Sequence, residues 1–196
     1  MITIIDYNAG NLFSVKSALE RLGEKYVITS KKEEIERAEK IIFPGVGRAS
    51  QSMNELKKLD LIETIKNLKV PFLGICLGAQ LLFDFSEEDN TKCLSIISGD
   101  IKRFQLPQEL KIPHIGWNNI KITKDDKFTE GISDKDNVYF VHSYYIDTNN
   151  KYILGKTEYG ISFTSIVKNN NFYGVQFHPE KSGKSGEKLL QNFISL

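Results

Sequence analysis

Cys76 lies in a glycine-rich segment whose residue types could support nucleophilic chemistry. The segment reads Gly74-Ile75-Cys76-Leu77-Gly78-Ala79-Gln80 and begins within the apolar run 71–75. Glycines two residues before and two after the cysteine suit a sharp turn from a strand into a helix. Such a turn places the thiol at the carboxyl end of a sheet and at a helix N-terminus, which favours an anion. We predict that Cys76 is a nucleophile, although a cysteine in ordinary surroundings is more often structural.

The surroundings of Cys76 supply two further candidates. The backbone amide of Leu77 would point towards a carbonyl under attack, and Gln80 lies one helical turn further on the same face. The second cysteine, Cys93, follows the acidic, polar loop 87–92 and has no such context. We expect Cys93 to be structural.

A base for the thiol is found in the segment Phe177-His178-Pro179-Glu180, which follows an apolar run. In an extended chain, residues two apart face the same side at about 6–7 Å between their Cα atoms. Glu180 can therefore hold one nitrogen of His178 and leave the other nitrogen for a thiol. Taken alone, this segment could be a surface turn. The chain has only 3 histidines, and they lack the spacing of metal ligands, so we expect no metal site.

The segment Pro44-Gly45-Val46-Gly47 closes another apolar run. Glycines on both sides of Val46 would let its backbone amide face a developing oxyanion, and would let the peptide flip. An ordinary turn is the alternative for this segment.

The elements around these candidates alternate in type over the first half of the chain. We predict strands over 3–6, 26–29, 41–43 and 71–75, and helices over 12–22, 33–38, 49–68 (broken near 59–60) and 77–85. This alternation is typical of an α/β fold with a mostly parallel sheet and helices on both faces.

The second half is rich in β-branched and aromatic residues and has little helical periodicity. We predict strands over 96–104, 119–123, 138–145, 153–157, 161–167 and 172–177, with a closing helix over 186–194. These strands form an antiparallel extension or join the main sheet late. No linker divides the chain, so we expect a single domain over residues 1–196.

The composition excludes several classes of protein. With 26 Lys and Arg against 25 Asp and Glu, the net charge of +1 gives no general field for gripping nucleic acid. No apolar run approaches the roughly 20 residues of a membrane span. Two cysteines are too few for a disulfide framework. We expect a cytoplasmic protein.

Together these residues resemble the class I glutamine amidotransferases, and within them the glutaminase subunit of imidazole glycerol phosphate synthase. The family-wide motifs are the cysteine elbow 74–78 with Gln80, and FHPE at 177–180. The motifs more particular to this subunit are IDYNAGNL (5–12), PGVG (44–47), IPHIGWN (112–118), YFVHSY (139–144) and HPEKSG (178–183). The resemblance covers residues 1 to 196. The chain departs from the family at Asn8-Ala9, at Cys93 and at Thr164-Ser165.

The resemblance implies a flavodoxin-like sheet of the class I glutamine amidotransferase type with a small antiparallel extension, and no cofactor. It implies roles for the following residues: Cys76, His178 and Glu180 as a catalytic triad; Val46 and Leu77 as oxyanion donors; Gly47, Gln80, His142, Ser143 and Tyr144 as the glutamine pocket.

The resemblance also implies a partner. The chain would hydrolyse glutamine and pass ammonia to a cyclase subunit that makes imidazole glycerol phosphate and AICAR in histidine biosynthesis, as a heterodimer. Asn11, Tyr139 and Lys181 would face that cyclase, although Lys181 could be an ordinary surface lysine. His114 and Trp117 could pack under a loop, and His142 is expected in the pocket rather than as a base.

Other functions remain open at this point. The same chemistry could supply ammonia to a synthase of an aminosugar, of anthranilate or of aminodeoxychorismate. A cysteine peptidase or a redox chaperone would have no evident use for Gln80 and the His178-Pro179-Glu180 segment. A binding protein with an inactive triad would have no need of all three catalytic candidates.

Overall fold

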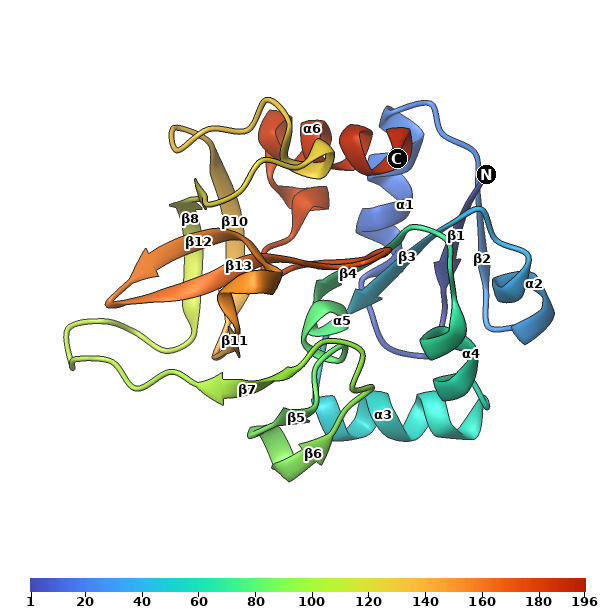
Figure 1. Ribbon diagram of the computed structural model, residues 1–196, viewed down its shortest axis with the longest axis horizontal. Coiled ribbons are helices and arrows are strands. Elements are labelled where there is room, and N and C mark those ends of the chain that lie inside the picture. Colours follow the sequence, from blue (N-terminus) through green and yellow to red (C-terminus); the bar gives the residue numbers. More distant parts are fainter.

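A core of parallel strands runs through the middle of the protein (Figure 1). The computed structural model describes residues 1–196. The core strands are, in spatial order, β2 (Tyr26–Thr29), β1 (Ile2–Ile5), β3 (Lys40–Gly45), β4 (Phe72–Cys76) and β14 (Phe172–Val175). All neighbouring pairs in this core are parallel. Their carboxyl ends therefore meet at one edge of the sheet.

Helices cover both faces of this core, as the sequence predicts (Figure 1). One face packs against α1 (Leu12–Arg21) and α6 (Gly183–Ser195). The other packs against α2 (Lys32–Glu36), α3 (Ala49–Lys58) and α4 (Ile62–Asn67). Successive residues of a strand point to opposite faces, so Ile4 joins the first apolar cluster and Ile5 the second.

The second half of the chain continues the sheet. Beyond β14 the strands follow in the order β13 (Ile161–Asn169), β11 (Tyr144–Thr148), β7 (Gly99–Arg103), β5 (Phe85–Ser86) and β6 (Thr91–Lys92). β12 (Ile153–Tyr159) pairs with β13, and β9 (Lys121–Ile122) pairs with β12. These pairings are antiparallel except for β5 with β7. The α/β fold class with its antiparallel extension is thus confirmed.

A separate antiparallel pair consists of β8 (His114–Asn119) and β10 (Asn137–His142). The predicted strand 138–145 is therefore two strands, because the chain passes from this pair into the main sheet at Ser143. Short 3₁₀ turns complete the chain: η1 (Glu88–Asn90), η2 (Lys127–Thr129), η3 (Asn150–Tyr152) and η4 (Pro179–Lys181). None of the helices combines the length and the apolar character that a membrane crossing requires.

The predicted helix 77–85 is wrong in length, because α5 spans only Leu77–Gln80. The carbonyl groups of the next residues accept hydrogen bonds from a segment later in the chain. Leu81 O accepts from Leu94 N at 2.9 Å, and Phe83 O accepts from Ser95 N at 2.8 Å. Leu81 to Phe83 are also fully buried on every side. Because these carbonyl groups bond to the segment 94–97, they do not continue the i→i−4 pattern of a helix, and the chain turns into β5 instead.

Candidate active site

The candidate residues gather where the strands of the parallel core end. Gly45, the last residue of β3, pairs with Cys76, the last residue of β4. Val175 at the end of β14 pairs with Ile75, and the chain then continues to His178. The register of three parallel strands therefore brings the loop at Val46, the thiol and the imidazole to one edge.

The turn at Cys76 is sharp, as the glycine spacing predicts. The strain falls on the cysteine itself, which has φ 54° and ψ −112°. Gly78 serves a different purpose, since a Cβ there would lie 2.0 Å from the carbonyl oxygen of Phe43 in β3. Gly45 is equally crowded, with Gly78 N at 2.3 Å from its ideal Cβ. The glycines thus allow the start of α5 to press against β3, and the cysteine supplies the left-handed backbone.

His178 and Glu180 form a buried pair. His178 Nδ1 donates a hydrogen bond to Glu180 Oε1 at 2.7 Å. Ser182 fixes the turn behind them, because its Oγ donates to His178 O at 2.6 Å and accepts from Tyr139 N at 2.9 Å. With Nδ1 engaged, His178 Nε2 is the nitrogen left for Cys76.

The electrostatics of His178 favour its charged form. Burial opposes the charge, but hydrogen bonds with Cys76 and Glu180 and their electrostatic attraction outweigh burial and raise the pKa of His178 to about 10. An imidazolium beside a thiol is the charge state that stabilises a thiolate. The arrangement can therefore support attack on a carbonyl carbon followed by proton transfer.

Gln80 is joined to Cys76 through a residue that the sequence did not single out. Gln80 Nε2 donates to Tyr144 O at 3.1 Å and to Gln176 Oε1 at 2.9 Å. The fully buried Gln176 in turn directs its Nε2 to Cys76 Sγ at 3.8 Å. Both N–H groups of Gln80 are thus engaged within the protein, which leaves only its oxygen for a ligand. Alternation along the strand could have indicated Gln176, since it lies two residues before His178.

His142 and His114 are buried next to the site. Tyr144 O can only accept, so His142 Nδ1 donates to it at 2.7 Å. His142 Nε2 then accepts from His114 Nδ1 at 3.0 Å. Burial lowers the pKa of His142 to about 3 and that of His114 to about 4, so both are neutral at pH 7. His114 therefore belongs to the core, whereas Trp117 is 57% exposed and packs under no loop.

A cavity of about 380 Å³ opens over the thiol. All the residues predicted for the pocket and the oxyanion lie in its wall, together with Cys76 and His178: Val46, Gly47, Leu77, Gln80, His142, Ser143 and Tyr144. Glu180 lies behind His178 and outside the wall. Glu88, Pro113 and Val141 complete the lining and were missed in the sequence. Glu88 is the only acidic residue among them. It lies in the polar loop 87–92 before Cys93, which carries no recognisable motif in the sequence.

The remaining candidates lie outside the cavity. Asn11 caps α1, where its side chain accepts from Ser14 N at 3.2 Å. Lys181 is exposed in η4. Tyr139 pairs with Trp117 across the β8–β10 pair. Cys93 is partly buried, and burial raises the pKa of its thiol to about 12. No group of three His, Cys, Asp or Glu residues is placed to hold a metal ion.

Solved structures share this fold. A crystal structure of a glutamine amidotransferase superposes with a TM-score of 0.77 at 17% identity, covering 100% of this chain and 98% of its own. The structure of PurLQS from Thermotoga maritima gives a TM-score of 0.72 at 18% identity, covering 99% of this chain and 97% of that chain. At these identities the likeness concerns the fold alone.

Sequence comparisons reach further. Residues 3–196 match the family described as glutamine amidotransferase class-I. The chain is 49% identical to imidazole glycerol phosphate synthase subunit HisH of Bacteroides thetaiotaomicron, over 100% of this chain and 99% of the relative. It is 48% identical to the HisH subunit of Methanocaldococcus jannaschii, over 100% of both. The chain therefore belongs to the class I glutamine amidotransferase family and, within it, to the HisH subunits of imidazole glycerol phosphate synthase.

Proposed function

We propose that this chain hydrolyses glutamine to glutamate and ammonia, with Cys76, His178 and Glu180 as the catalytic triad. The observation that carries the proposal is the thiol at its strained turn, facing the hydrogen-bonded His178–Glu180 pair beside one cavity. The identity of the relatives supports the same reaction.

The proposed reaction begins when the Cys76 thiolate attacks the side-chain carboxamide carbon of glutamine. The amides of Val46 and Leu77 hold the resulting oxyanion. His178 donates its Nε2 proton to the departing nitrogen, and the C–N bond breaks to release ammonia. His178 then takes a proton from water, the water oxygen attacks the thioester carbon, and the C–S bond breaks to release glutamate.

The cavity suits an amino acid as substrate. Glutamine carries an ammonium group, and Glu88 has the only carboxylate side chain in the lining. We assign the recognition of that ammonium to Glu88. Gly47, Gln80, His142, Ser143 and Tyr144 form the rest of the proposed pocket.

We further propose that the ammonia passes to a cyclase subunit that makes imidazole glycerol phosphate in histidine biosynthesis. The names of the relatives support a partner subunit, and the exposed apolar side chains of Phe13, Ile115 and Trp117 are candidates for contact with it. Asn11, Tyr139 and Lys181 are our candidates for the same surface. A direct transfer protects ammonia from becoming unreactive ammonium in water.

We also propose a single domain and a cytoplasmic location for this chain. A single domain over residues 1–196 is supported by the two apolar clusters, which pack on opposite faces of one continuous sheet. A cytoplasmic location is supported by two free cysteines.

Cys76→Ala tests the proposed function. In the complex with the cyclase, glutamine-dependent synthesis should fall by at least about a thousandfold, because the nucleophile is gone. Synthesis supplied with free ammonia should continue at the wild-type rate and serves as the control for assembly. Glutamine turnover retained by Cys76→Ala would refute the triad.

A further inference from the structure

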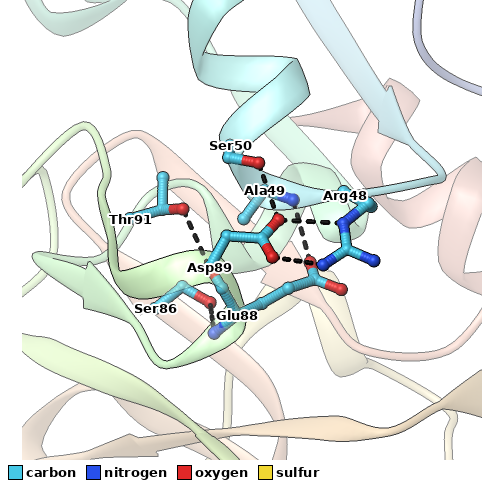
Figure 2. Close-up of polar contacts among 7 residues, drawn as sticks. All are labelled: Arg48, Ala49, Ser50, Ser86, Glu88, Asp89 and Thr91. Atoms are coloured by element: carbon cyan, nitrogen blue, oxygen red, sulfur yellow. Dashed lines mark hydrogen bonds and ion pairs between the residues drawn. The ribbon is translucent and has the colours of Figure 1, made fainter.

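The tip of the β5–β6 hairpin lies against the segment that follows the proposed oxyanion loop, Pro44 to Gly47. Figure 2 shows side chains of the tip reaching the start of α3. These contacts join two parts of the chain that are about 40 residues apart, since Arg48 and Asp89 are separated by 41 positions.

Asp89 makes the densest set of these contacts. Arg48 donates through Nε to Asp89 Oδ2 at 2.9 Å and through Nη2 to Oδ1. Ser50 Oγ donates to the same Oδ2 at 2.7 Å. Hydrogen bonds from Arg48 and Ser50 lower the pKa of Asp89 to about 2. A two-pronged guanidinium–carboxylate pair fixes orientation as well as distance.

Glu88 makes the second connection. Arg48 occupies the N-cap position of α3 and offers no side-chain acceptor, and Ala49 N donates instead to Glu88 Oε2 at 2.8 Å. The backbone of Glu88 is held in turn, because its N donates to Ser86 Oγ at 3.2 Å and its O accepts from Thr91 Oγ1 at 2.8 Å (Figure 2). A residue in the cavity wall therefore caps the helix that begins just after the oxyanion loop.

The loop itself has few other restraints on this side. Tyr7 Oη holds its first residue by donating to Pro44 O at 2.9 Å. Val46 is 41% exposed. Gly47 has φ +97° and open space where a Cβ would lie. The contacts with Glu88 and Asp89 therefore anchor the far end of the loop.

We propose that Arg48 and Asp89 are positioning residues for the glutamine reaction. Their ion pair locks the tip that carries Glu88 to the segment that carries the Val46 amide, so that the two sides of the cavity keep one spacing. This inference rests on the proposed function, in which Glu88 receives the ammonium of glutamine and Val46 receives the oxyanion. Neither Arg48 nor Asp89 lines the cavity.

If the Arg48–Asp89 pair only stabilised the fold, its loss would lower the melting temperature along with turnover. Arg48 is an exposed side chain, and exposed ion pairs contribute little to stability. Misplacing a reacting group by about 1 Å can nevertheless reduce a rate by about 100-fold. Loss of the pair should therefore change turnover far more than it changes the melting temperature.

The test is a double-mutant cycle with Arg48→Gln, Asp89→Asn and both together, in the full chain assembled with the cyclase. Asn is suited to position 89, whose φ is 57°. Each single variant should lose at least about tenfold in glutamine-dependent kcat/KM, with KM raised and kcat lowered. The double variant should lose no more than either single variant, because all three lack the same pair.

Two controls isolate the pair. Ammonia-dependent turnover should stay unchanged in all three variants. Arg21→Gln removes a comparable exposed pair, that of Arg21 Nε with Glu187 Oε1 at 3.0 Å, and should change neither activity. Unchanged glutamine kinetics in the single variants would overturn the proposal, as would losses that multiply in the double variant or a parallel loss of ammonia-dependent turnover. Absence of glutamine turnover in the assembled wild type would instead refute the proposed function.

Discussion

Glu180 has one hydrogen-bond partner in the protein, the imidazole of His178. Its Oε1 accepts from His178 Nδ1, and its Oε2 is buried without a protein partner. A carboxylate so placed can orient the imidazole and stabilise its charge. Glu180 itself does not line the cavity over the Cys76 thiol. The two residues should therefore differ in the size of their effect on turnover.

We predict that His178→Asn lowers glutamine-dependent kcat by at least about 10³-fold, because it removes the proton donor and acceptor. Glu180→Gln should lower kcat by a smaller factor, on the order of 10²-fold, because the imidazole remains. Both variants are compared in the same complex with saturating glutamine. Equal losses, or a larger loss for Glu180→Gln, would remove Glu180 from the role of orienting residue.

Among the secondary-structure elements, β8 and β10 bury a pair of neutral histidines, His114 and His142, against the aromatic core. His114 stacks between Phe140 and Tyr159, at ring-centroid distances of 4.9 and 4.0 Å. Burial holds the pKa values of His114 and His142 at about 4 and about 3, below the ordinary 6.5. Such groups contribute stability above pH 6.5, and this contribution is lost as the pH falls towards their folded-state values.

We predict that the free energy of unfolding falls between pH 6.5 and 5, by on the order of 2 kcal/mol for each histidine. Urea unfolding at the two pH values measures the loss. His178 does not hide this loss. Its pKa is raised to about 10, so its own contribution to stability is lost only as the pH rises from about 6.5 to 10. The His114→Gln variant should show about half the loss, and a loss equal to that of the wild type would contradict the assignment.

The sequence predicts the placement of the site better than it predicts where some helices and strands end. The position of His178 next to Cys76 could be predicted, because parallel strands end at one edge and the motifs follow two such strands. The length of α5 could not, because carbonyl groups of Leu81 and Phe83 bond to a segment that folds back from later in the chain. The break at Ser143 could not either, because the residues on its two sides pair with different strands, β8 and β7. The role of Glu88 in the cavity could not be predicted for the same reason, since only the docking of the β5–β6 hairpin places Glu88 in the cavity wall.

Across the protein as a whole, three of the exposed large apolar side chains come from β8 and from the start of α1. Trp117 and Ile115 on β8 are 57% and 59% exposed, and Phe13 at the start of α1 is 76% exposed. Tyr139, opposite Trp117 on β10, accepts from His178 N through its carbonyl at 2.9 Å. Tryptophan is enriched among the residues that dominate protein–protein interfaces, so Trp117 is our candidate for a contact with the cyclase.

We predict that Trp117→Ala weakens binding of the cyclase by about 2 kcal/mol, or roughly 30-fold in Kd, because buried tryptophans dominate such interfaces. Titration of the cyclase with the labelled chain measures the affinity. Ile28→Ala is the matched control: Ile28 is 36% exposed on β2, the edge strand of the parallel core, and its loss should leave Kd unchanged. Equal Kd values for wild type and Trp117→Ala would place the interface elsewhere.

The left-handed backbone at Cys76 also bears on how this protein can drift over generations. Holding a residue with a side chain at φ 54° and ψ −112° costs on the order of 1–3 kcal/mol, a strain that glycine would not carry. Selection for stability alone would therefore favour glycine at position 76. In a duplicated copy that no longer needs to catalyse the reaction, replacement of Cys76 by glycine would increase the stability of the fold. A cysteine that persists at this turn thus marks a lineage in which turnover is still under selection.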